Sequence, residues 1–74
     1  NMDQLAMDVS KGQGETLDAL AQIIGVQQSD TSAFNATMQA NFDSMFSAEG
    51  TSATAYEGMQ QAMETNVELQ KYLG

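Results

Sequence analysis

The amino-acid sequence predicts an all-α protein, a small bundle of four to five short helices around a central phenylalanine-rich helix. Apolar residues recur every three or four positions, proline is absent, and no segment alternates apolar and polar residues as a strand would. The length of 74 residues suffices for one domain, which we place at residues 1–74. Because the chain begins with asparagine, we expect it to be a fragment of a longer precursor.

The first two predicted helices are short, and each ends at a glycine. The apolar face of the first consists of Met2, Leu5 and Val9. It ends near Gly12, which can adopt the left-handed conformation of a helix cap. The second begins at Glu15 and ends at Gly25, so that Val26 would fold back after the cap. Its apolar face consists of Leu17, Leu20, Ala21 and Ile24.

The central helix is predicted at residues 30–46, with Ser29 or Asp30 as its N-cap. Its apolar face, the longest in the chain, consists of Phe34, Met38, Phe42, Met45 and Phe46. We expect a break at residues 47–51, with Gly50 as the hinge. The predicted core consists of Phe34, Met38, Phe42, Leu20 and Ile24.

A fourth helix should start at Thr51 or Ser52, although Gly58 inside it costs about 1 kcal/mol relative to alanine. Its apolar face consists of Ala55, Tyr56, Met59, Ala62 and Met63. The spacing of Thr65 and Glu68 matches a capping box and predicts a break before a last short helix. That helix would carry Leu69, Tyr72 and Leu73 on one face.

The charge balance excludes several partners. Ten carboxylates face two lysines and no arginine, for a net charge of −8. Nucleic-acid binding needs several cationic contacts, which Lys11 and Lys71 cannot supply. No apolar run approaches the roughly 20 residues that span a bilayer, so we expect no membrane insertion. The partner should be an unknown protein or small ligand, and a basic partner suits this surface best.

Histidine and cysteine are both absent, which removes the usual general base, the thiolate nucleophile and the common zinc ligands. We therefore predict no catalytic, cofactor or metal site, and a protein that is not an enzyme. Tyr56 and Tyr72 have no neighbouring base in the sequence, so we interpret each as an aromatic at the edge of the core with its hydroxyl in water.

An alternative function follows from Asp43, Ser44 and Met45. Acyl carrier proteins are small acidic helical domains that carry phosphopantetheine on the serine of such a motif. Ser44 would be the modified residue. In carriers, however, this serine begins a helix, whereas Ser44 falls near the end of a predicted one, and Asn41 stands where the carrier motif has glycine.

Six methionines allow two interpretations: adaptable core residues, which we favour, or the lining of a soft groove for a partner helix. The modest number of large apolar residues also predicts a weak homodimer. We expect it to cover Met7, Ile23 and Val26, which lie off the main apolar faces.

One stretch is similar to an uncharacterised family, a domain of unknown function in secreted or periplasmic proteins of Gram-negative bacteria. The resemblance is carried by residues 2–6, by residues 11–21 with their Gly-Gln-Gly-Glu segment, and by Gly25 and Val26. It continues through Asp30, Phe34, residues 41–42, 46–47 and 68–72. It implies the C-terminal helical part of a precursor, a periplasmic or secreted location, and no catalytic residues.

Overall fold

The computed structural model describes residues 2–46 and 52–73, and within these two ranges it contains helices and no strand. In chain order the elements are α1 (Met2–Lys11), α2 (Glu15–Ile24), the 3₁₀ helix η1 (Gln28–Asp30), α3 (Thr31–Ala40), α4 (Phe42–Met45), α5 (Ser52–Glu64) and the 3₁₀ helix η2 (Gln70–Tyr72). The all-α prediction is confirmed. The expected break at residues 47–51, with its hinge at Gly50 and the cap at Thr51, lies outside the described residues.

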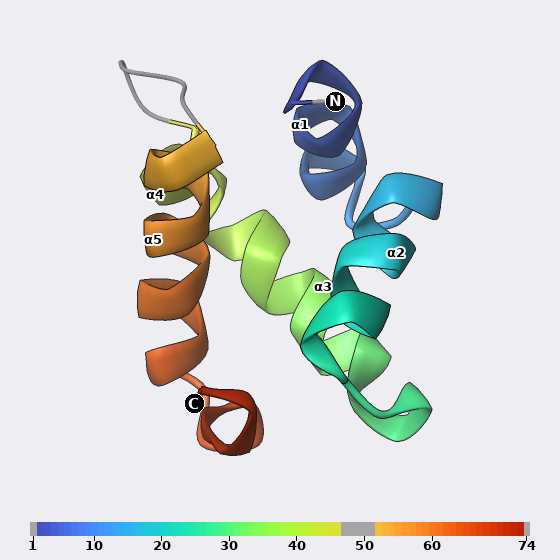
Figure 1. Cartoon of the computed structure of the whole chain (residues 1–74), viewed down its shortest axis with the longest axis vertical. Helices are drawn as coiled ribbons and strands as arrows, with labels where there is room; N and C mark the ends of the chain where they lie inside the picture. Colours follow the sequence, from blue (N-terminus) through green and yellow to red (C-terminus); the bar gives the residue numbers. More distant parts are fainter. Residues whose placement is uncertain (1, 47–51, 74) are drawn as a thin grey trace.

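Helix α3 lies at the centre of the bundle. It crosses diagonally between α1 and α2 on one side and α5 on the other (Figure 1), and it contacts all three. The helix starts and stops follow the predicted glycines. Gly12 and Gly25 adopt positive φ angles of 78° and 91°, and the N–H of Val26 donates to the carbonyl of Ala21 at 2.9 Å after the second cap.

The predicted central helix at residues 30–46 is wrong in one respect, because it is interrupted at Asn41. This residue leaves the helical conformation, with φ −113° and ψ 24°. Its side-chain Nδ2 donates to the carbonyl of Thr37 at 2.8 Å, which offers the backbone an alternative to a continuing helix. The chain resumes as the four-residue α4, where the rings of Phe42 and Phe46 pack 4.9 Å apart.

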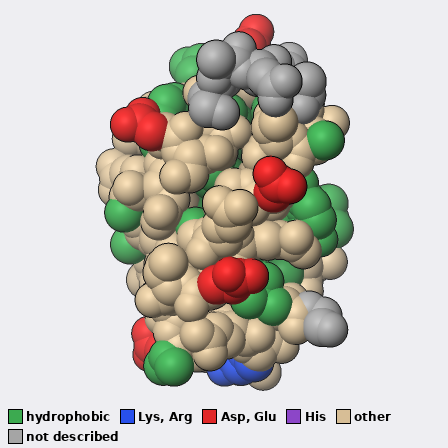
Figure 2. Space-filling model, turned by 90° about the vertical axis from the view of Figure 1, so that its left-hand side faces the viewer, with side chains coloured by type: hydrophobic (Ala, Val, Ile, Leu, Met, Phe, Trp, Pro, Cys, Tyr) green, Lys and Arg blue, Asp and Glu red, His purple; other side chains and the backbone are tan. Residues whose placement is uncertain are grey.

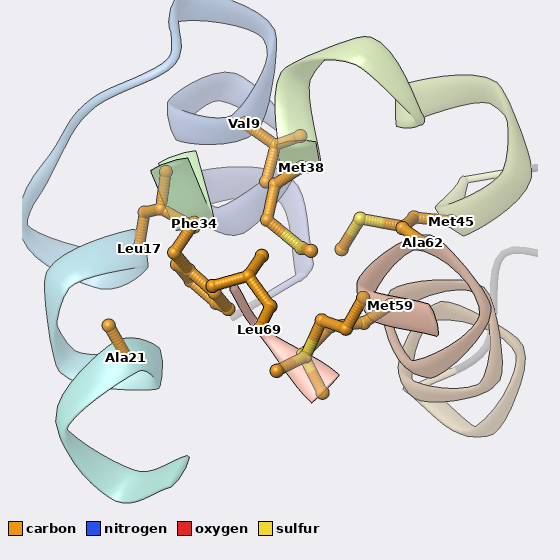
Figure 3. Packing of buried hydrophobic residues seen from close by; sticks show 10 residues of the cluster. Val9, Leu17, Ala21, Phe34, Met38, Met45, Met59, Ala62 and Leu69 are labelled. Carbon is orange, nitrogen blue, oxygen red and sulfur yellow. The ribbon is translucent and has the colours of Figure 1, made fainter. Parts of the chain in front are cut away.

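Methionine is the most frequent residue type in the core. Phe34, Met38, Leu17, Val9 and Leu69 are 0% exposed, and the remaining buried apolar residues of the cluster are Ala21, Met45, Met59, Ala62 and Met63. Figure 3 shows Leu17 and Phe34 entering this interior from the α2 and α3 side, and Met45 and Met59 from the α5 side. Of the five residues predicted to form the core, Phe34 and Met38 are buried, whereas Phe42, Leu20 and Ile24 are partly buried against it.

The exposed apolar residues differ slightly from expectation. Met7 and Ile23 are exposed, at 53% and 83% of their surface, as predicted. Val26, in contrast, is partly buried and packs against the core. Its position follows from the Gly25 cap, which turns the chain back onto α2.

The C-terminal segment contacts η1 through the side chain of Asp30, a residue predicted to cap the central helix. Asp30 occupies the N-cap position of α3, as predicted, but its side chain makes no capping hydrogen bond. Its Oδ2 instead accepts the hydroxyl of Tyr72 at 2.5 Å and pairs with Lys71 Nζ at 2.9 Å. The Tyr72 hydroxyl is therefore hydrogen-bonded to protein groups. The break after α5 occurs as expected, but Asn66 rather than Thr65 accepts the N–H of Glu68, at 2.9 Å.

Candidate functional site

An apolar groove in the surface is lined by residues from four helices, α1, α2, α4 and α5. Its volume is about 180 Å³. We call it the methionine groove, and its lining residues are Met2, Leu5, Leu20, Met45, Ser52, Ala55, Tyr56 and Met59. Apart from two hydroxyl groups, every lining side chain is apolar.

Helical spacing explains why these residues meet. Met2 and Leu5 stand three positions apart on α1, and the four lining residues of α5 follow the spacing of one helix face. Met45 and Met59 belong to the buried core, so they form the floor of the groove. Tyr56 is 54% exposed and lies at its edge. The groove is thus an opening of the core to the surface.

Two larger hollows have a different chemistry. One of about 510 Å³ lies between α2 and η1 and is lined by Asp18, Gln22, Gln28 and Thr31 together with Ala21 and Val26. The other, of about 400 Å³, lies between α3 and the segment after α5, with small and polar residues around it. The first holds a single carboxylate and the second holds no titratable side chain, so neither offers an acid and a base side by side.

The structure also contains a buried carboxylate that the sequence did not predict. Asp8 is 2% exposed although it lies on the short helix α1. Its Oδ2 accepts the N–H groups of Thr16 at 2.8 Å and Leu17 at 3.2 Å, and its Oδ1 accepts Gln4 Nε2 at 3.1 Å. Asp8 therefore caps the N-terminus of α2 from the neighbouring helix.

Gly14 makes this capping arrangement sterically feasible. It occupies the N-cap position of α2 with φ 147°, and it has no side chain to cap the helix. A Cβ atom here would lie 2.1 Å from the carboxylate carbon of Asp8, so any other residue would displace the carboxylate. The arrangement fixes α1 against α2, and these helices supply Met2, Leu5 and Leu20 to the groove.

Nearly the whole chain matches one family. Residues 1–73 match the family described as "Protein of unknown function (DUF3015)". The chain belongs to this family. The resemblance to an uncharacterised domain of unknown function is thereby confirmed. No curated protein and no solved structure matches the chain.

The environment of Asp8 keeps its carboxyl group ionised. Burial disfavours the charged form and alone would raise the pKa of Asp8. The hydrogen bonds from Gln4, Leu17 and Thr16, together with the attraction of Lys11, outweigh burial and hold this pKa below its ordinary value of 3.8. A lowered pKa in the folded state means that the ionised carboxylate stabilises the fold, and that protonation removes this stabilisation.

Replacing Asp8 with asparagine is expected to lower the melting temperature at pH 7 by several degrees. Asparagine keeps one oxygen for the N–H groups of α2 but loses the negative charge, and its amide nitrogen would require Gln4 to turn from donor to acceptor. Protonated Asp8 also stabilises the fold less than the carboxylate does. The difference in melting temperature between the natural protein and Asp8→Asn should therefore be constant above about pH 5 and become smaller as the pH falls below about 4. Thermal unfolding followed by circular dichroism measures the melting temperatures of the two proteins at each pH.

Glu64→Gln is the control for the change in net charge, because Glu64 is an exposed residue at the end of α5. The capping role of the Asp8 carboxylate would be contradicted if the melting temperatures of the natural protein and Asp8→Asn differed by the same amount at pH 7 and at pH 3.

The alternative site residue, Ser44, lies on the surface of the four-residue α4. It stands near the end of that helix, as the sequence predicted, rather than at the start of a long one. Its modification with phosphopantetheine stays a prediction. Its carbonyl oxygen packs against Gly58 of α5, so the backbone at Ser44 is closely held.

The described residues contain no group of three or more His, Cys, Asp or Glu side chains placed to hold a metal ion. In the same part of the chain, no helix combines the length and apolar character needed to cross a membrane.

Proposed function

We propose that this protein is a non-enzymatic binding module of the periplasm, and that the methionine groove takes up an apolar group of its ligand or partner. The observation that carries the proposal is the composition of the groove. Three methionines from three different helices, Met2, Met45 and Met59, meet at one opening in the surface. Methionine side chains are flexible and polarisable, which suits a site that adapts to what it binds.

The size of the groove indicates what it can hold. Pockets for whole drug-sized ligands and cofactors are usually about 300–1,000 Å³ in volume. At about 180 Å³ the groove is smaller, and it is close to the roughly 150 Å³ apolar cavity that accepts a benzene molecule. It therefore suits one aromatic ring or one or two branched side chains.

The periplasmic location is supported by the resemblance to secreted and periplasmic proteins of Gram-negative bacteria. The non-enzymatic role is supported by the composition, because a chain without histidine or cysteine has only carboxylates as general bases near neutral pH. A weak homodimer stays a prediction, with Met7 and Ile23 as the exposed apolar residues that it would cover.

Toluene titration tests the groove directly. With ¹³C-methyl-labelled methionine, the NMR signals of Met2, Met45 and Met59 should move as toluene binds, with a dissociation constant on the order of 1 mM. The signal of Met7 should stay in place, because this exposed residue does not line the groove. Equal shifts of all six methionines, or none, would contradict the proposal.

A pair of substitutions on α5 provides the matched control. Ala55 lines the groove and is 4% exposed, so Ala55→Leu should fill the space and abolish the toluene shifts. Ala53 is exposed on the same helix, so Ala53→Leu should leave them unchanged. Circular dichroism shows whether each variant keeps its helices.

A further inference from the structure

We infer that the natural occupant of the methionine groove is the apolar face of a cationic amphipathic helix. This inference rests on the proposed function and adds the chemistry of the partner.

An amphipathic helix matches the shape of this site. Such a helix presents apolar anchor side chains at spacings of three and four residues to a hydrophobic groove. The groove has room for one or two such side chains. The half-exposed Tyr56 at its edge offers further apolar surface to the partner.

The charges near the groove are negative. Each of three helices that line it carries an exposed carboxylate, namely Asp3 on α1, Asp43 on α4 and Glu57 on α5. Each lies one or two positions from a lining residue of the same helix, namely Met2, Met45 and Tyr56, and none of the three lines the groove itself. A partner with lysine or arginine on its polar face would meet them beside the groove.

Both cations of the chain lie away from the groove. Lys71 is at the C-terminal end, where it pairs with Asp30 at 2.9 Å. Lys11 ends α1, six residues and about 9 Å along the helix from Leu5, the lining residue of α1 that is nearer to it. Figure 2 shows the α5 side of the molecule, where the basic side chains (blue) appear at the lower end and acidic side chains (red) are spread over the face above them. At physiological salt charges are screened beyond about 8 Å, so neither lysine offsets the carboxylates near the groove.

The same charges disfavour two other occupants. An anionic lipid surface would be repelled by a molecule with a net charge of −8. A second copy of this chain would bring the same charge with it. A cationic helix is attracted where both of these are repelled.

The test uses a 14-residue synthetic helix with leucine at spacings of three and four residues and lysine elsewhere. It should shift the methyl signals of Met2, Met45 and Met59, and its affinity should fall several-fold between 50 mM and 300 mM sodium chloride. A peptide with glutamate in place of lysine should bind at least tenfold more weakly, and so should one with serine in place of leucine.

Matched variants locate the charge effect. Asp43→Asn combined with Glu57→Gln should weaken binding of the lysine peptide several-fold and leave toluene binding unchanged. Glu64→Gln combined with Glu68→Gln removes the same charge near the C-terminal end of the molecule and should have a smaller effect. Equal affinity for the lysine and glutamate peptides, or equal effects of the two double variants, would overturn the inference.

The remaining outcomes separate this inference from the proposed function. Toluene binding without peptide binding would overturn the inference alone, whereas the loss of both would overturn the proposed function as well. Methyl shifts that appear with phosphatidylglycerol vesicles, or on raising the protein concentration, while the lysine peptide has no effect, would show a lipid or a second copy as the occupant instead.

Discussion

Phe34→Ala is expected to remove about 3–5 kcal/mol from the free energy of unfolding, the usual loss when a fully buried phenylalanine is truncated. Phe34 is 0% exposed and lies on the central helix α3, between the helices on either side. Folded domains of this length are stable by roughly 4–11 kcal/mol in total. The variant should therefore be partly unfolded at 37 °C, and urea denaturation followed by circular dichroism measures the loss.

Phe42→Ala is the matched control. The same side chain is removed, but Phe42 is only partly buried and packs at the edge of the core. Its loss should be less than half of that for Phe34. Equal losses at the two positions would contradict the placement of Phe34 at the centre of the bundle.

Gly58→Ala should destabilise the protein by about 1–3 kcal/mol, the usual cost of forcing extra atoms into a packed interior. A Cβ atom on Gly58 would lie 2.5 Å from the carbonyl oxygen of Ser44 and 2.8 Å from the Cα of Met45. Both are backbone atoms of α4, so the two helices would have to move apart. Thermal or urea unfolding checks the sign and the size of the effect.

The direction of this effect is diagnostic. Replacing glycine with alanine inside a helix normally stabilises it by up to about 1 kcal/mol. A stabilised Gly58→Ala protein would therefore show that α4 does not approach α5 as described. In the destabilised protein, the methyl signal of Met45 should also move, because this residue forms part of the groove floor next to the contact.

Local patterns in the sequence predicted most helix boundaries. The glycine caps at Gly12 and Gly25 were found because a positive φ angle is cheap only for glycine. The apolar spacing identified the buried faces of α1, α2 and α5 for the same kind of reason, since a helix places residues three and four apart on one side. These features depend on neighbours in the chain alone.

The interruption at Asn41 was missed although its cause is local. The apolar face predicted for the central helix continues past Asn41 without a gap, from Phe34 to Phe46, and asparagine is tolerated within helices. The deciding contact is the hydrogen bond from its side chain to Thr37, one of several alternatives open to that side chain. Periodicity does not distinguish between them.

Of the candidate site, the sequence predicted the kind of residue involved, methionine, but not whether these residues line an open groove. The sequence allowed the methionines to be either core residues or the lining of a groove, and the structure shows Met45 and Met59 as both. Whether a buried face is covered or open depends on how α1 and α5 are spaced across the bundle. That spacing is a property of the packed helices and not of any one of them.

By itself, the sequence determined the helical class, the strongly acidic charge and the absence of histidine and cysteine chemistry, because composition and periodicity are properties of the chain. Only the tertiary structure decided what Asp8, Asp30 and Gly58 do. Asp8 caps a helix eight residues ahead, Asp30 holds a tyrosine 42 residues away, and Gly58 admits the backbone of another helix. Each role depends on a partner brought close by packing, and no pattern along the chain specifies that partner.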